Sequence, residues 1–126
     1  MNLRTPLSQV RGLGSAKEGV SHWWWQRLTA VALVPLTLWF VISVIAHMGA
    51  DYEAMRAWVG SPSVAVTMVL LIAATFYHLK LGAQVVIEDY VHHGATKLVA
   101  LVLLNFATVV LAVIGIYSVL SIAFRG

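Results

Sequence analysis

His78 stands inside a long apolar stretch, where an ionisable side chain is costly to bury and usually has a function. Its imidazole can ligate a metal or a haem, relay protons, or form a hydrogen bond between helices. Gly82 follows four residues later and so shares the same face of a helix. A glycine there leaves clearance beside the imidazole for a flat macrocycle or for another backbone. Because glycine also packs membrane helices without any cofactor, the spacing leaves haem ligation and plain packing both open.

Asp89 and Tyr90 end the same stretch. Asp89 comes eleven residues after His78, close to three helical turns, so the two share a face if the helix continues that far. A tyrosine hydroxyl stays protonated and can donate a hydrogen bond to a carbonyl, and a carboxylate can orient it or pass protons. The pair fits a membrane-soluble carbonyl ligand. The alternative is an ordinary tyrosine and charged loop at the membrane boundary.

Other ionisable residues have simpler interpretations. Lys80 is two positions from His78 and points to a different face, where we expect it to snorkel or to pair with a carboxylate such as a haem propionate. His47 ends another apolar stretch and is expected at the membrane interface. His92 and His93 are expected to be solvated in a loop.

The composition indicates a membrane protein. The chain has 126 residues, of which 60% are hydrophobic and 10% charged, and its mean hydropathy is +0.86. A soluble domain of this length needs more charged residues to cover its surface. There are no cysteines, which excludes disulfides, thiolate-held iron–sulfur clusters and covalent c-type haem in this chain. The net charge is +3, but the sequence has no basic stripe, so we expect no nucleic-acid partner.

Three apolar runs are each long enough to cross a bilayer as a helix, and lipid offers the backbone no other partner. We therefore predict an all-α membrane protein with spans at about 28–47, 64–87 and 98–124. Three such runs make a soluble helical core improbable. The whole chain, 1–126, is predicted to be one transmembrane domain. By helix length, His78 lies about 14 Å from the nearer boundary, close to the midplane.

Basic residues predict the orientation, because they concentrate on the cytoplasmic side. Residues 1–27 have no apolar signal region and are expected to form a mature cytoplasmic segment, with the carboxyl terminus outside. This favours the bacterial cytoplasmic membrane over the mitochondrial inner membrane. Residues 23–25, three tryptophans, are expected at the inner headgroup level, and Pro35 is expected to kink the first span. The basic residues of the amino-terminal segment are Arg4, Arg11, Lys17 and Arg27.

Two blocks of sequence together are more specific than any single residue. "SHWWWQRLTA" leads into the first span, and "H-x3-G-x-Q-V-V-x-E-D-Y-V-H" closes the second. With three spans in a chain of this size, the sequence resembles the hydrophobic membrane anchor subunits of succinate dehydrogenase, respiratory complex II. The resemblance covers nearly the whole chain. The block from His78 to Tyr90 is its most specific part, and the remainder matches only as hydrophobicity.

The resemblance implies roles for particular residues. His78 would be an axial ligand of haem b iron, and Tyr90 and Asp89 would bind ubiquinone. Arg27 would lie near the quinone and the haem propionates. His22 lies in the first block, but relatives vary there, so it is assigned no role.

The resemblance also implies partners, because one deep histidine cannot give iron two axial ligands. A second membrane anchor (cytochrome b) subunit would share the haem and complete the helical bundle. Electrons would come from succinate through a flavoprotein subunit and an iron–sulfur subunit, so this chain is not catalytic alone. Two alternatives stay open: the anchor of a fumarate reductase running in reverse, and a haem-free structural or assembly protein.

Overall fold

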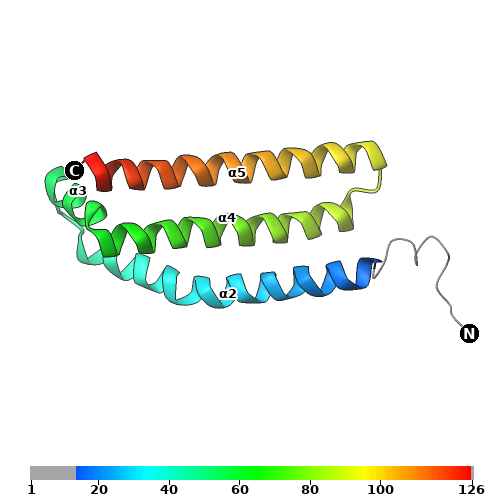
Figure 1. Ribbon diagram of the computed structural model, residues 1–126, viewed down its shortest axis with the longest axis horizontal. Helices are drawn as coiled ribbons and strands as arrows, with labels where there is room; N and C mark the ends of the chain where they lie inside the picture. The colour runs from blue at the N-terminus through cyan, green and yellow to red at the C-terminus, as the bar shows by residue number, and fades with distance from the viewer. Residues whose placement is uncertain (1–13, 126) are drawn as a thin grey trace, which may run out of the picture.

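The computed structural model describes residues 14–125, and side chains from residue 19 onward. The described chain is helical: α2 (Gly14–Ala46), α3 (Tyr52–Gly60), α4 (Pro62–Tyr90) and α5 (Gly94–Arg125), as Figure 1 shows. Helices α2, α4 and α5 are long and apolar enough to cross a membrane. The prediction of an all-helical chain with three long apolar helices is therefore confirmed.

The helices extend past the predicted spans, because a helix continues through polar residues where an apolar run stops. Residues 14–27 are the first turns of α2 rather than a separate segment before it. Figure 1 shows α2 as a bowed but unbroken helix that contains Pro35. At 1.5 Å per residue, the 29 residues of α4 are about 43 Å long, against a hydrocarbon core of about 30 Å. Part of α4 must therefore project beyond the hydrocarbon.

Helix α3 is the element that the sequence analysis did not predict. Its nine residues follow a turn in which Gly49 adopts a left-handed φ of 85°, a conformation that favours glycine. The Asp51 carboxylate caps the helix by accepting a hydrogen bond from the backbone N–H of Ala54, at 2.8 Å. Trp58 of α3 stacks on His47, with ring centroids 4.3 Å apart. The stacking ties the end of α2 to α3, at what we call the α3 end of the molecule.

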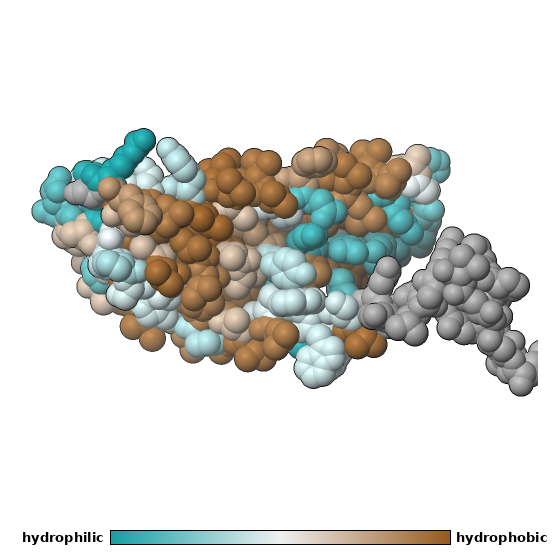
Figure 2. Space-filling model, in the orientation of Figure 1, coloured by the Kyte–Doolittle hydropathy of each residue, from teal (hydrophilic) through white to brown (hydrophobic). Residues whose placement is uncertain are grey.

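Helix α4 lies between the other two long helices. It packs against both α2 and α5, whereas α2 and α5 have at most marginal contact with each other. The three helices therefore form an open layer rather than a closed bundle (Figure 1). Most apolar side chains on the layer are exposed, and Figure 2 shows one apolar face with hydrophilic residues gathered toward the two ends. Such a surface needs lipid or other membrane helices to cover it.

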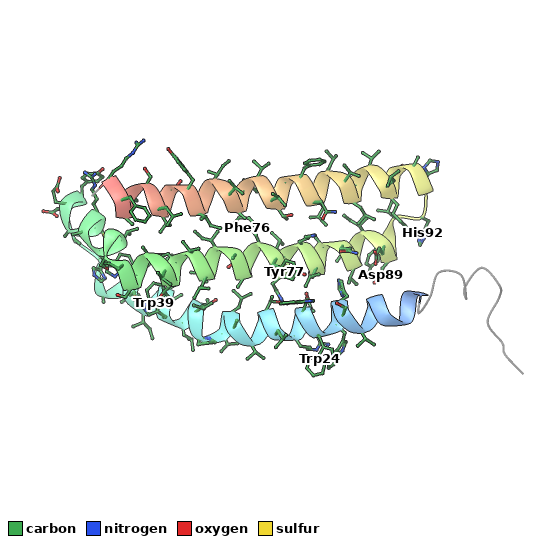
Figure 3. All side chains as sticks on the ribbon, viewed as in Figure 1. Trp24, Trp39, Phe76, Tyr77, Asp89 and His92 are labelled. Atoms are coloured by element: carbon green, nitrogen blue, oxygen red, sulfur yellow. The ribbon has the colours of Figure 1, made fainter. Side chains whose placement is uncertain are left out.

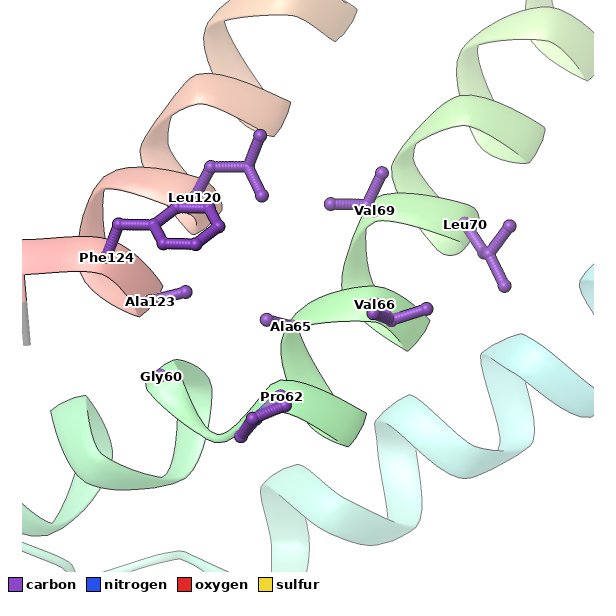
Figure 4. Close-up of a pocket in the computed structure, with 9 residues that line it drawn as sticks. All are labelled: Gly60, Pro62, Ala65, Val66, Val69, Leu70, Leu120, Ala123 and Phe124. Atoms are coloured by element: carbon purple, nitrogen blue, oxygen red, sulfur yellow. The ribbon is translucent and has the colours of Figure 1, made fainter.

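The buried core lies toward the α3 end. Ala65, Met68 and Val119 form it, and Trp39 and Trp58 pack against it. Beside this core, α4 and α5 border an apolar groove of about 330 Å³, and Ala65 is one of the residues that line it (Figure 4). Toward the opposite end of α4, which ends at Tyr90, the buried hydrophobic residue of this helix is Leu81. The half of the layer that contains His78 and Tyr90 is thus the less packed half.

Close packing of α4 on α5 depends on Gly115. A Cβ atom added there would lie 3.3 Å from the Ile72 side chain, tighter than ordinary contact. We expect Gly115→Leu to lower the free energy of unfolding by about 1–3 kcal/mol, because the helices must separate. Denaturant titration of the purified assembly measures this. Gly19→Leu is the control, since a Cβ at Gly19 meets nothing within 4 Å. Equal stability of the two variants would contradict this packing.

Candidate functional site

His78 lies where α4 faces α2. Its ring is half-buried, and its Nδ1 atom is 3.0 Å from the hydroxyl oxygen of Thr29 on α2. Thr29 is 8% exposed, and its hydroxyl is also 2.7 Å from the carbonyl oxygen of Trp25. Among the described residues, Nε2 of His78 has no hydrogen-bond partner, and this atom is not fully buried. One nitrogen of the ring is thus held by α2, while the other is available to a group outside the described chain.

Gly82 faces the same helix. A Cβ atom added at Gly82 would lie 3.7 Å from Nε2 of Gln26, an ordinary van der Waals contact. An alanine at this position would therefore fit against α2. The clearance predicted at Gly82 for a flat macrocycle stays a prediction.

The α2 side of this contact contains residues that the sequence analysis assigned no role. His22, Gln26 and Thr29 follow a spacing of four and three residues, so they lie on one face of α2. Nε2 of His22 and Oε1 of Gln26 are buried without a hydrogen-bond partner among the described residues. Such atoms are costly unless paired, and because they are already buried within the chain, a group from outside reaches them only if the side chains rearrange. Only the pairing of α2 with α4 reveals this face, and hydropathy does not predict that pairing.

The contact between Thr29 and His78 also gives a depth. Trp25 lies four residues from Thr29, about 6 Å along α2. From Trp25 to Ala46 the helix rises about 31 Å, which matches the hydrocarbon core of about 30 Å. If the tryptophans mark the boundary, His78 lies about 6 Å inside it, not the 14 Å expected from the length of its span. The two estimates place the boundary at different residues, so the depth of His78 in the membrane stays a prediction.

Lys80 lies on a different face of α4 from His78, as predicted. It borders a groove of about 320 Å³ between α4 and α5, together with Tyr77 and Thr108. Its ammonium is 5.8 Å from the centre of the Tyr77 ring, at cation–π range. Tyr77 in turn packs edge-on against Trp25, with centroids 5.7 Å apart. The lysine is thus directed at an aromatic ring and not toward His78.

Asp89 and Tyr90 lie in the last turn of α4, so the helix does continue far enough for Asp89 to share the face of His78. Both residues are exposed, Tyr90 by 78% (Asp89 is labelled in Figure 3). The neighbouring Glu88 accepts a hydrogen bond from the Gln84 amide at 3.1 Å. Tyr90 is about 18 Å from His78 along the axis, so the two mark separate positions on one helix.

Arg27 is not brought against His78 within this chain. Arg27 precedes Thr29 by two positions, which places it about 200° around α2 from Thr29. Its guanidinium lies 5.1 Å from the centre of the Trp23 ring. Arg27 is exposed, and Figure 3 shows Trp24 projecting away from α4. Any contact of Arg27 with a haem propionate or a quinone must therefore form on the outward face of α2.

The remaining histidines occupy other places. His92 and His93 are exposed in the connection between α4 and α5, as predicted. His47 lies one residue past α2, and its Nδ1 atom is 2.7 Å from the Ser43 carbonyl oxygen. No group of three or more His, Asp or Glu residues that could hold a metal ion occurs in residues 14–125. A single histidine with one available nitrogen could supply one axial ligand to a haem iron.

Comparisons with known proteins identify the family of the chain. Residues 1–120 match the family described as succinate dehydrogenase/fumarate reductase transmembrane subunit. The hydrophobic membrane anchor subunit of succinate dehydrogenase from Rickettsia bellii is 29% identical over 119 residues, which cover 92% of this chain and 95% of the relative. The corresponding subunit from Paracoccus denitrificans is 34% identical over 112 residues, covering 89% and 87%.

A third relative, the succinate dehydrogenase membrane anchor subunit of Reclinomonas americana, is 31% identical over 71% of this chain and 77% of its own length. No solved structure matches the chain. The family match covers the first span, the contact of Thr29 with His78 and the end of α4 alike. The chain therefore belongs to the succinate dehydrogenase/fumarate reductase transmembrane subunits, as a hydrophobic membrane anchor subunit of succinate dehydrogenase.

Proposed function

We propose that this anchor subunit ligates haem b through Nε2 of His78 and forms part of the site where ubiquinone is reduced. The observation that carries the haem role is the asymmetric environment of the His78 ring. Thr29 engages Nδ1, and Nε2 has no hydrogen-bond partner among the described residues. When bound, haem b supplies a one-electron carrier beside the quinone site.

A second membrane anchor subunit would complete the haem pocket. The layer of α2, α4 and α5 has two open faces, and its own core lies toward the α3 end. Three helices in one layer do not enclose a macrocycle, so the second axial ligand and the other wall belong to another chain.

The quinone role is proposed for the exposed end of α4. The Tyr90 hydroxyl donates a hydrogen bond to a quinone carbonyl, and the Asp89 carboxylate orients the hydroxyl or exchanges protons with water. This chain has no cysteine to hold an iron–sulfur cluster, so electrons reach the quinone from an iron–sulfur subunit, which receives them from a flavoprotein subunit. Exposure of Tyr90 is consistent with a site that partner subunits complete.

The orientation is proposed from the distribution of basic residues, with the amino terminus in the cytoplasm of a bacterium and the carboxyl terminus outside. The end of α4 would then face the cytoplasm, where the iron–sulfur subunit docks. Trp25, at about 31 Å from the end of α2, would mark the inner boundary of the hydrocarbon core.

The orientation can be tested with single cysteines, since the natural chain has none. Ala50 and Ala95 are both exposed and lie at opposite ends of the layer. We expect Ala50→Cys to react with a membrane-impermeant maleimide from outside, and Ala95→Cys only in inside-out vesicles. Labelling after unfolding in detergent is the control for reactivity. The reversed pattern would contradict the orientation.

The haem role can be tested with His78→Gln, which keeps a side chain able to hydrogen bond with Thr29 but is a poor ligand for iron. We expect the purified complex to lose haem or to show an altered reduced-minus-oxidised spectrum. His47→Gln is the control, because His47 stacks on Trp58 at the other end of the layer. An unaltered spectrum and midpoint potential in His78→Gln would exclude the ligand role.

The quinone role can be tested with Tyr90→Phe, which removes only the hydroxyl. We expect the rate of quinone reduction to fall about tenfold, because the loss of one hydrogen bond costs roughly 1.4 kcal/mol. Succinate oxidation with an artificial dye and the assembly of the complex should not change. Tyr117→Phe, at an exposed tyrosine of α5, is the matched control. Normal quinone turnover in Tyr90→Phe would remove Tyr90 from the site.

A further inference from the structure

Thr29 is buried at the one point where α2 forms a hydrogen bond with the ring of His78. Its hydroxyl oxygen lies 2.7 Å from the Trp25 carbonyl oxygen, 3.2 Å from the Gln26 carbonyl oxygen and 3.0 Å from Nδ1 of His78. A threonine hydroxyl has one proton to donate and lone pairs to accept with. The distances therefore decide how that proton is shared among three neighbours.

The shortest distance assigns the proton. A carbonyl oxygen only accepts, so the contact of 2.7 Å requires the hydroxyl to donate to Trp25, the residue four positions earlier in α2. The same oxygen then has only lone pairs left for His78, so Nδ1 must donate to it. A neutral imidazole with its proton on Nδ1 has an unprotonated Nε2. Nε2 is thus the nitrogen with a lone pair for a metal.

We propose that Thr29 is a positioning residue that fixes the tautomer and the ring orientation of His78, so that Nε2 is presented to the haem iron. This inference rests on the proposed haem role of His78. The hydrogen bonds run in one direction, from His78 Nδ1 to Thr29 and from Thr29 to the carbonyl of Trp25. Such partners of a ligating histidine make the ring a stronger electron donor, and they can be worth 10–100-fold in metal affinity.

The effect of this electron donation on the midpoint potential of the haem can be measured. A more basic imidazole stabilises ferric over ferrous iron, so the Thr29 hydroxyl lowers the midpoint potential of the haem. Without the hydroxyl, Nδ1 has no acceptor at this place, and the proton can move to Nε2 or the ring can turn. Either change weakens the bond from His78 to the iron.

Thr108 separates this role from ordinary helix bonding. It is 5% exposed, and its hydroxyl lies 2.8 Å from the Leu104 carbonyl oxygen and 3.1 Å from that of Asn105. This repeats the contacts of Thr29 with its own helix. Among the described residues, Thr108 forms no hydrogen bond with a histidine. If Thr29 served only to bond with its own helix, replacing Thr29 by valine should have the same effect as replacing Thr108 by valine.

The test compares Thr29→Val, Thr29→Ser and Thr108→Val in the purified complex, with haem content, redox titration and the electron paramagnetic resonance signal of the ferric haem as measurements. Thr29→Val keeps the shape and removes the hydroxyl. We expect it to bind haem about tenfold more weakly, with a more positive midpoint potential and a changed resonance signal. Thr29→Ser should resemble the natural protein, and Thr108→Val should leave all three unchanged.

If Thr29→Val does not assemble, Thr29→Cys replaces it, because a thiol accepts hydrogen bonds only weakly and should shift the potential in the same direction. Natural haem content, potential and signal in the variant that assembles would overturn the inference. If His78→Gln changes the spectrum while Thr29→Val does not, only the role of Thr29 fails. If neither variant changes it, or if the natural assembly contains no haem, the haem role fails as well.

Discussion

The contact between Thr29 and His78 is the interaction on which the account of this chain depends. It joins two helices whose residues are 49 positions apart in the sequence, with 3.0 Å between the two side-chain atoms. It meets the requirement that a polar group inside a membrane protein find a partner. It also distinguishes the two nitrogens of one ring, since Nδ1 faces Thr29 of α2 and Nε2 has no hydrogen-bond partner among the described residues.

The open layer has a related physical cause. Apolar side chains on α2, α4 and α5 are mostly exposed, because lipid gives membrane helices no hydrophobic reason to close around one another. The buried cluster of residues 14–125 lies toward the α3 end, where α3 packs against α4 and α5. The opposite half has polar side chains and little core of its own, as expected for a surface that other subunits cover. A subunit built in this way has its full set of contacts only in the assembled complex.

The sequence predicted the elements better than their pairing. Long apolar runs predicted the three spans, because composition alone decides whether a helix is stable in lipid. Helix α3 was missed, since nine residues with an Asp51 cap resemble a loop in hydropathy. Thr29 was missed for another reason: its importance follows from the register of α2 against α4, which no periodicity in either helix reveals. The face of Arg27 was likewise unpredictable until α2 had a neighbour. The roles of His78, Asp89 and Tyr90 came from the sequence block and stay predictions.

The most direct measurement is a structure of the assembled complex, with its partner subunits and pigment, by electron cryomicroscopy. The account predicts density for a haem whose iron is bonded to Nε2 of His78, with Nδ1 of the same ring within hydrogen-bonding distance of the Thr29 hydroxyl. A haem ligated only by residues of other chains, with the His78 ring bonded solely to protein atoms, would contradict it.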